Sequence, residues 1–214
     1  MSFFHKPKTS SSEVNMQYPA THLVMMGVAG SGKSTIAAAL SKQLGWACAE
    51  ADEFHPQSNI DKMSRGIPLQ DEDRWPWLLQ IRNWMTEQAT AGRSTVLTCS
   101  ALKRSYRQLL SEAEGRVLFI HLHGEAALIS ERMQGREGHF MPPTLLPSQL
   151  AALEPLSPEE LADGSLRLDI SRSPQELIEA IVAALKLPSN PVSAPASDSN
   201  SDPDPDSDPA HRAH

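Results

Sequence analysis

Residues 27–34 read Gly27-Val28-Ala29-Gly30-Ser31-Gly32-Lys33-Ser34, which fits the G-x-x-x-x-G-K-[ST] phosphate loop at every fixed position. Residues 23–27, which lead into this motif, are apolar or small and predict a strand. The alanine-rich sequence after Lys33 predicts a helix. In that setting the glycines let backbone N–H groups turn inward, and the helix N-terminus adds positive potential. The stretch therefore predicts a site for the phosphates of a nucleotide.

The motif also predicts what its side chains do. Lys33 is placed to reach the outer phosphates of ATP, and the Ser34 hydroxyl is placed to ligate Mg²⁺. ATP and Mg²⁺ are thus the expected cofactors. The residues expected to bind ATP in this loop are Gly27, Val28, Ala29, Gly30, Ser31, Gly32, Lys33, Ser34 and Thr35.

The positions of the acidic residues distinguish between classes of phosphate-loop protein. Motor ATPases and GTPases hold Mg²⁺ with an aspartate that ends an interior strand. The apolar runs at 95–99 and 117–120 end without one, and the sequence has no N-K-x-D tetrapeptide. Glu50 and Asp52 instead follow the second predicted strand, where alternate residues of an extended segment share a side. This arrangement indicates a small-molecule kinase in which Asp52 accepts the proton of the attacking hydroxyl and Glu50 positions the water shell of the metal.

Composition narrows the class further. The chain has 214 residues and a net charge of −7, which argues against broad nucleic-acid binding. It has no apolar run of the length of a membrane span and no apolar centre of a signal peptide near its start, so we expect a cytoplasmic protein without a membrane partner. The two cysteines, Cys48 and Cys99, form no C-x-x-C pair. We expect both to be packed thiols in a reducing compartment.

We expect one folded domain with extensions at both ends. Residues 1–20 are expected to be a flexible extension. Residues 188–214 are rich in Pro, Ser and Asp and are expected to be disordered, because they contain almost no large apolar side chain to offset the loss of chain entropy. Residues 21–187 remain as the kinase domain.

Within this domain strands and helices alternate. Strict alternation with short links predicts an α/β fold with a five-stranded parallel sheet and helices on both faces, a three-layer sandwich of the P-loop NTPase type. Binding sites in such sheets lie beyond the carboxyl ends of the strands. The strands are expected at 22–26, 46–49, 94–99, 116–122 and 166–170, and the helices at about 33–44, 56–65, 71–91, 103–113, 125–136 and 174–186.

The alternation lapses between the fourth and fifth strands. Residues 137–160 contain too many prolines for one helix, and so long a connection in a compact domain is usually functional. We expect a lid here. Arg132 and Arg136 lie four residues apart on one face of the preceding helix, where they would bracket the base and the phosphates of ATP, and Arg136 is expected to act in catalysis. His139 is a further candidate for ligand contact.

Several sequence blocks resemble those of the gluconokinases, in order, over about residues 20 to 187. The resemblance implies ATP-dependent phosphorylation of D-gluconate to 6-phosphogluconate, which feeds the pentose phosphate or Entner–Doudoroff pathway. It also implies a sheet like those of adenylate kinase and shikimate kinase, and a homodimer. One departure is Glu50, where many relatives carry aspartate. The blocks are the phosphate loop 27–34, Asp52-Glu53-Phe54-His55-Pro56, Asn59-Ile60-Asp61-Lys62-Met63, Gly66-Ile67-Pro68-Leu69, Asp71-Glu72-Asp73-Arg74-Trp75-Pro76-Trp77-Leu78, Cys99-Ser100-Ala101-Leu102-Lys103, Tyr106-Arg107 and His139-Phe140-Met141.

The chemistry of gluconate agrees with these blocks. It is a polyol that ends in a carboxylate, so its site needs at least one cation and groups that hydrogen-bond hydroxyls. His55 and Asp52 suit the hydroxyl end near the γ-phosphate. The candidate cations for the carboxylate are Lys62, Arg74, Lys103 and Arg107.

Three tryptophans and two histidines that could bind a ligand are expected to have structural roles instead. Trp75, Trp77 and Trp84 have near-helical spacing, which favours core packing over a wall that stacks on sugar. His121 and His123 share one face of a strand, but no third ligand accompanies them in sequence, so we expect no tightly bound zinc.

Two other functions stay open at this stage. One is a nucleotide or shikimate-type kinase on the same scaffold. The other is a regulatory protein that binds ATP without catalysis, which the presence of both Lys33 and Asp52 disfavours because a binding module has no need of a base.

Overall fold

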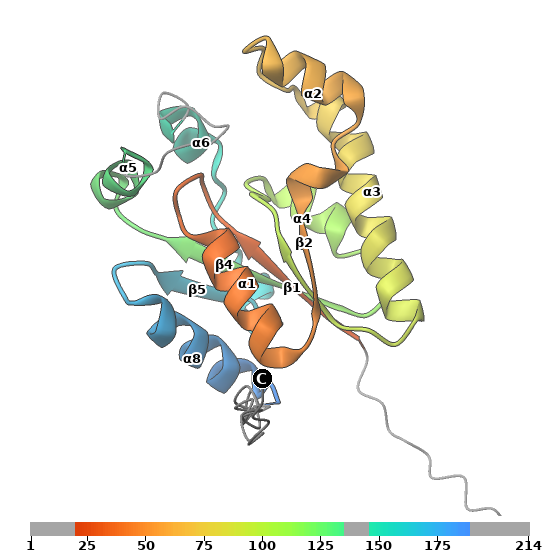
Figure 1. Ribbon diagram of the computed structural model, residues 1–214, viewed down its shortest axis with the longest axis vertical. Coiled ribbons are helices and arrows are strands. Elements are labelled where there is room, and N and C mark those ends of the chain that lie inside the picture. Colours follow the sequence, from red (N-terminus) through yellow and green to blue (C-terminus); the bar gives the residue numbers. More distant parts are fainter. Residues whose placement is uncertain (1–19, 135–145, 189–214) are drawn as a thin grey trace, which may run out of the picture.

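The computed structural model describes residues 20–134 and 146–188 of the chain. Its centre is a five-stranded parallel sheet of order β2-β3-β1-β4-β5, which confirms the predicted fold class (Figure 1). The phosphate loop follows the central strand, so it lies at the middle of the carboxyl edge. The strands are β1 (Thr21–Met26), β2 (Ala47–Glu50), β3 (Thr95–Thr98), β4 (Arg116–His123) and β5 (Leu166–Asp169).

Helices connect the strands and cover both faces of the sheet. They are α1 (Lys33–Leu44), α2 (Gln57–Ser64), α3 (Asp71–Thr90), α4 (Arg104–Leu110), α5 (Ala126–Gln134), α6 (Leu146–Ala152), α7 (Pro158–Ala162) and α8 (Pro174–Leu185), with a 3₁₀ turn η1 (Ala51–Phe54) after β2. α6 lies inside the expected lid and α7 begins in it, a segment in which the prolines were expected to rule out one continuous helix. Each is short enough to begin at or just before a proline and end before the next one, so the prolines of this segment separate helices rather than prevent them.

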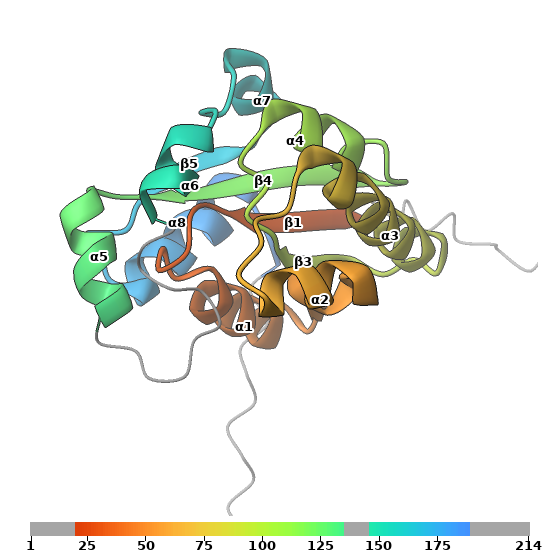
Figure 2. The ribbon, with the colours of Figure 1, turned by 90° about the horizontal axis from the view of Figure 1, so that it is seen from above.

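The alternation of side chains along β1 divides the core in two. Leu23 and Met25 pack under α1 and α8, whereas Val24 and Met26 pack under α3 and α4. Figure 2 shows α1 and α8 on one side of the sheet and α4 and α7 on the other. Because β1 is buried on both faces, its sequence is continuously apolar from Leu23 to Met26.

Helix ends form where the sequence supplies capping groups. Asp71, Glu72 and Asp73 occupy the first turn of α3, and the Gln70 and Asp73 side chains form a capping box there. α8 begins in the same way with Ser173 and Glu176, and α1 ends at Gly45 in the left-handed conformation.

α2 and the first turns of α3 project beyond the carboxyl edge on one side of the phosphate loop, and α5 and α6 lie on the other (Figure 1). Residues 1–19, 135–145 and 189–214 lie outside the described residues, and with them nearly all of the extensions expected at 1–20 and 188–214. No helix within 20–134 or 146–188 combines the length and apolar character that a bilayer span requires.

Candidate active site

The phosphate loop has a backbone that only glycine fits at two positions. Gly27 has φ +137°, and a Cβ there would lie 2.6 Å from the carbonyl oxygen of Leu122. Gly30 has φ +80°, and a Cβ there would lie 2.6 Å from Cγ of Met133. The first turn of α1 follows directly and contains no acidic residue. The loop thus combines turns that require glycine with a helix N-terminus free of acidic residues, which suits an anion.

Within this loop the lysine contacts the loop's own backbone. Lys33 Nζ donates to the carbonyl oxygens of Gly27 at 3.0 Å and of Val28 at 2.9 Å. Ser34 and Thr35 are exposed at the start of α1. Gln149 of α6 was not identified from the sequence, yet its Oε1 accepts a 2.7 Å hydrogen bond from the N–H of Ala29. The loop is thus joined to the helix that follows residues 135–145.

The two acids expected beside the loop adopt different backbone conformations. Glu50 is the last residue of β2, and its Oε2 accepts a hydrogen bond from the Thr98 hydroxyl of β3. Asp52 lies in the η1 turn and is exposed, so the expectation of one extended segment carrying both acids on one side is wrong. The chain turns directly after Glu50 because η1 seats Ala51 in the core beneath α3.

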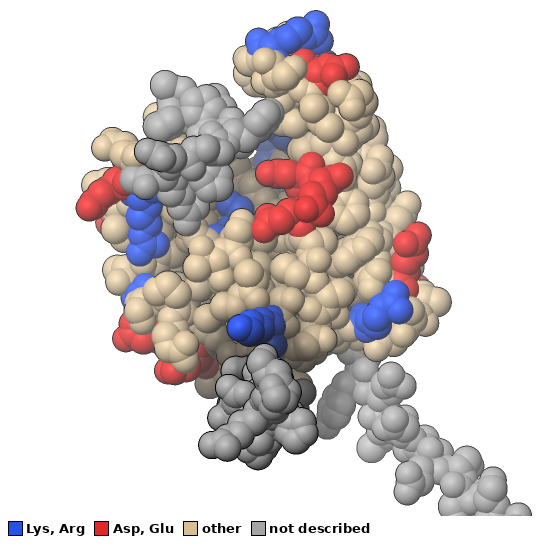
Figure 3. Space-filling view, in the orientation of Figure 1, with Lys and Arg blue, Asp and Glu red and all other residues tan. Residues whose placement is uncertain are grey.

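Asp52 nevertheless lies at the same carboxyl edge of the sheet as the phosphate loop, with β3 between β2 and β1. Burial raises the pKa of the Cys99 thiol to about 12, and the charges of both Asp52 and Lys33 act on that thiol. Cys99 directly follows β3, the neighbour of β1. Glu50 pairs with Thr98 of β3, and the N–H of Gly27 donates to the carbonyl of Ser100 at 3.2 Å, so the η1 turn and the phosphate loop lie at the same edge of the sheet. Figure 3 shows acidic side chains gathered over β2 and η1, beside a hollow in which basic atoms are visible.

Two of the candidate cations are bound to carboxylates of α3. Lys62 Nζ lies 2.5 Å from Asp73 Oδ1, and Lys103 Nζ lies 2.7 Å from Asp71 Oδ2. Hydrogen bonds from Lys103 and Tyr106 hold the pKa of Asp71 below its usual range, and the bond from Lys62 does the same for Asp73. These pairs fix the start of α3 to α2 and α4.

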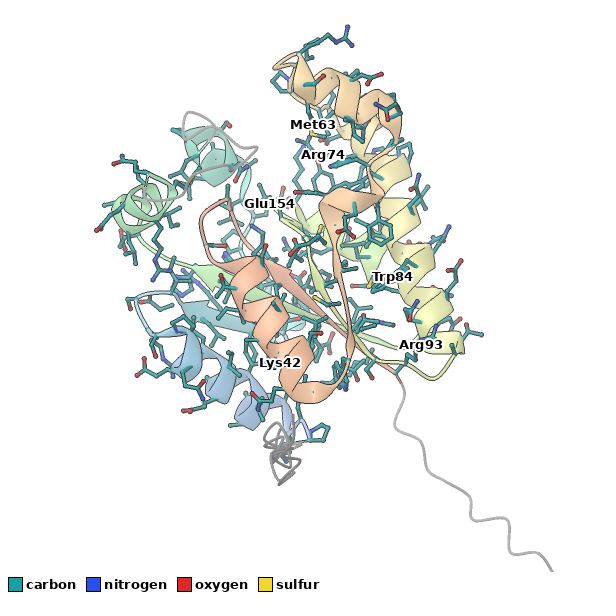
Figure 4. The ribbon with its side chains drawn as sticks, viewed as in Figure 1. Lys42, Met63, Arg74, Trp84, Arg93 and Glu154 are labelled. Carbon is teal, nitrogen blue, oxygen red and sulfur yellow. The ribbon has the colours of Figure 1, made fainter. Side chains whose placement is uncertain are left out.

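Arg74 is more loosely paired. Its Nη1 lies 3.8 Å from Oδ1 of Asp71, and its side chain is 32% exposed. Figure 4 shows Arg74 on the side of α3 that faces the centre of the molecule. The charges of Asp52 and Arg74 both act on the imidazole of His55, the residue that follows η1. His55 therefore lies within electrostatic reach of both the proposed base and this cation.

Arg107 does not join this group. Its side chain is 1% exposed, and it donates from Nε and Nη2 to the two carboxylate oxygens of Glu160 at 2.6 and 3.0 Å. The remaining donors bind backbone carbonyls, among them that of Glu154 at 3.0 Å. The expectation that Arg107 faces gluconate is corrected here, because every guanidinium edge is used inside the protein.

The same contacts shorten the expected lid. Glu154 N–H donates to the carbonyl of Leu102 at 2.8 Å, and Leu156 is buried in the core on the α3 and α4 face. Residues 153–160 are thus packed against α4 as part of the domain. Leu146 is likewise buried in the core, and Gln149 bonds to Ala29, so only residues 137–145 of the expected lid remain, and they lie outside the described residues.

A cavity of about 280 Å³ lies beside the phosphate loop. Arg132 was expected to meet the nucleotide base and lines this cavity, and its Nη2 donates to the carbonyl of Ile170 at 2.8 Å. Arg136 and His139 lie outside the described residues. The cavity is lined by Ser31, Gly32, Thr35, Ile36, Arg132, Arg172, Pro174 and Leu177.

The remaining sequence expectations have mixed outcomes. Cys99 is buried as expected, but Cys48 is exposed because β2 is the edge strand. His121 is buried at 2% exposure, and no cluster of three His, Cys, Asp or Glu residues suited to a metal occurs within the described part of the chain. Trp77 is a core residue as expected, with Nε1 donating to the carbonyl of Ala51 at 2.7 Å.

Comparisons with known proteins agree with this architecture. Residues 23–156 match the family model described as an AAA domain. The gluconokinase of Gluconobacter oxydans is 44% identical over 170 residues, which cover 79% of this chain and 94% of that relative. The chain belongs to the gluconokinase family. The predicted family is thereby confirmed, over a length that includes the phosphate loop, the acids and α3.

Solved structures extend the comparison to three dimensions. A gluconokinase from Sinorhizobium meliloti has a TM-score of 0.67 at 42% identity, with 79% of this chain and 93% of that one covered. A sugar kinase from Janibacter has a TM-score of 0.74 at 52% identity, with 79% and 96% covered. The matched residues thus cover nearly the whole of both solved structures.

Proposed function

We propose that this chain transfers the γ-phosphoryl group of ATP to a hydroxyl of D-gluconate, giving 6-phospho-D-gluconate and ADP. Family membership supports the reaction. Within the site, Asp52 follows β2 at the same carboxyl edge of the sheet as the phosphate loop, and Arg74 of α3 faces the centre of the molecule (Figure 4). A base at the edge that carries the phosphate loop and a cation on α3 suit the two ends of a hydroxy acid.

The residues of the chain have separate roles in this proposal. Lys33 and the loop amides stabilise negative charge on the phosphates of ATP. The hydroxyl oxygen of gluconate forms a bond to the γ-phosphorus, the bond from that phosphorus to the bridging oxygen of ADP breaks, and the hydroxyl proton passes to the Asp52 carboxylate. Because such transition states are loose, Asp52 contributes mainly by orienting the hydroxyl.

The residues at the loop also suit Mg²⁺. Ser34 offers an exposed hydroxyl at the start of α1, and Glu50 offers a carboxylate at the end of β2. Mg²⁺ is usually held by one or two protein oxygens together with phosphates and waters, so a larger cluster is not required. When bound with ATP it neutralises charge on the phosphate oxygens.

Arg74 is our choice for the cation that binds the gluconate carboxylate. Lys62 and Lys103 are each held by a carboxylate within 2.7 Å, and Arg107 is buried. Arg74 lies 3.8 Å from its carboxylate partner Asp71 and has a partly exposed, planar guanidinium that matches a carboxylate in two parallel hydrogen bonds.

A coupled assay that follows ADP, with 6-phosphogluconate identified as the product formed from gluconate, tests the proposal. At equal ATP, D-gluconate, D-glucose, shikimate and nucleoside monophosphates are compared, with Lys33→Ala as the inactive control. We expect turnover with gluconate and little with glucose, which lacks the carboxylate. Preferential turnover of shikimate or a nucleotide would mean that the chain is a kinase of another class. ATP binding without any turnover would indicate a regulatory protein.

The cellular setting and assembly belong to the same proposal. Two free cysteines suit a reducing compartment, which favours the cytoplasm. The expected homodimer is tested by light scattering during size-exclusion chromatography, which gives the mass of the complex.

A further inference from the structure

The imidazole of His55 is held from two sides. Its ring stacks on Trp77 with centroids 4.4 Å apart and planes inclined by 16°. Trp77 is itself fixed, because it is 4% exposed and its Nε1 is bonded to the carbonyl of Ala51. On the ring edge, Nδ1 of His55 lies 3.3 Å from Nδ2 of Asn59 in α2. The ring plane and one ring nitrogen are therefore both defined.

The orientation of the Asn59 amide follows from its second contact. Asn59 is 2% exposed, and its Nδ2 lies 2.8 Å from the backbone carbonyl oxygen of Asp73. A carbonyl oxygen only accepts, so the atom facing it must be the NH₂ group rather than the amide oxygen. The other hydrogen of that NH₂ group is directed to His55. Since an amide nitrogen only donates, Nδ1 of His55 must accept and carries no proton.

The charge state of the ring agrees with this arrangement. Burial lowers the pKa of His55, the charge of Asp52 raises it, and the charge of Arg74 lowers it. The ring is neutral above its ordinary pKa of about 6.5, so at neutral pH it carries one proton. With Nδ1 engaged as an acceptor, that proton resides on Nε2.

We propose that Asn59 is a positioning residue that holds His55 in the Nε2–H tautomer, so that His55 donates a hydrogen bond to the oxygen of the gluconate hydroxyl that Asp52 deprotonates. The substrate part of this inference rests on the proposed function. In this tautomer His55 has no lone pair to offer the hydroxyl, because its only unprotonated nitrogen faces Asn59. His55 therefore orients the nucleophile, and Asp52 remains the base.

The tautomer is measured directly by ¹⁵N NMR of the full chain with labelled histidine. His55→Gln identifies the His55 resonances by subtraction. We expect a pyrrole-type shift for Nε2 and a pyridine-type shift for Nδ1 at neutral pH, and a change in the Nε2 shift on addition of gluconate. An Nδ1–H tautomer, or an averaged mixture of both, overturns the proposal. Because this spectrum needs no turnover, it separates the inference from the proposed reaction.

A double-mutant cycle tests whether Asn59 acts through His55. We expect Asn59→Ala to lower kcat/KM for gluconate about tenfold in the native background and less than about twofold in the His55→Ala background. An equal loss in both backgrounds would mean that Asn59 acts through Asp73 and α3 alone, and it would overturn the proposal. Asn83→Ala, an exposed asparagine on α3, is the matched control. If Asn59→Ala does not fold, the spectrum of the native chain decides.

Discussion

The carboxylate of Glu160 pairs with the Arg107 guanidinium and also caps the N-terminus of its own helix, α7. Its Oε2 accepts from Nη2 of Arg107 at 3.0 Å and from the N–H of Ser157, at the start of α7, at 2.7 Å. Arg107 is buried on α4, so this carboxylate joins a helix on the sheet face to the segment that returns from α6. Within the Tyr106-Arg107 block, Arg107 thus has a structural role, because it anchors residues 153–160 to α4.

Glu160→Gln is expected to destabilise the fold by about 1.5–3 kcal/mol, because a buried guanidinium loses its countercharge. Urea unfolding followed by circular dichroism measures this loss. KM for gluconate should stay within about twofold of the native value, since Arg107 does not face the substrate. Glu159→Gln, whose partner Arg104 is 53% exposed, is the control and should change stability by less than about 0.5 kcal/mol. Unchanged stability with a raised KM would return Arg107 to the sugar site.

Arg74→Met is expected to raise KM for gluconate about 10- to 100-fold with a smaller change in kcat, because it removes a charge-assisted bond to a group remote from the transferred phosphoryl. Steady-state kinetics at saturating ATP provides the measurement. Arg82→Met, on the same helix and paired with Glu112, serves as the control. If KM were unaffected in Arg74→Met but raised in Lys103→Met, the carboxylate would lie against α4 instead.

Asp52→Asn keeps the shape of the side chain and removes its charge. We expect kcat for gluconate to fall by about 10²–10⁴-fold, the usual contribution of a general base, with KM for ATP changed far less. Asp52 is exposed, so the unfolding midpoint should not change. Glu53→Gln, in the same η1 turn, is the matched control. A variant that kept more than about a tenth of native kcat would exclude Asp52 as the base.

His121 makes the fold sensitive to acid. The residue is 2% exposed, and its buried Nδ1 has no hydrogen-bond partner in the parts of the chain that the structure describes. Burial, reinforced by the charges of His123, Arg167 and Arg107, lowers the pKa of His121 from 6.5 to about 4. Between these two values the unfolded chain binds a proton that the folded chain does not. The stability it contributes is present above pH 6.5 and is lost as the pH falls toward 4.

The expected loss from His121 is about 3 kcal/mol in total, of which about 2 kcal/mol falls between pH 6.5 and 5. The pKa values of His22, His55 and His123 are also lowered, chiefly by burial, so the native chain should lose more than this. Urea unfolding of the native chain and of His121→Gln at pH 7.5 and 5 isolates the residue. The stability of the variant should depend less steeply on pH, and equal slopes would contradict the assignment.

The sequence alone determined the fold class, the family and the phosphate loop. These follow from local signals: apolar strands alternate with helices, glycines stand at fixed spacing, and the block beginning at Asp71 contains its own helix-capping groups. Such signals depend on neighbours within a few residues, so they can be recognised without the fold. Glu50 and Asp52 were located in the chain for the same reason, although the turn between them was not foreseen.

Only the tertiary structure decided which residues meet. Arg107 and Glu160 are 53 residues apart in sequence, and Ala29 and Gln149 are 120 apart. The sequence offered four candidate cations for the gluconate carboxylate and gave no reason to choose among them. The structure separates them, because Lys62, Lys103 and Arg107 each have a carboxylate from another helix beside them. The tautomer of His55 depends on a carbonyl of α3 that orients an amide of α2. Charge pairing and hydrogen-bond direction act over a few ångströms in space, whereas a sequence gives only distance along the chain.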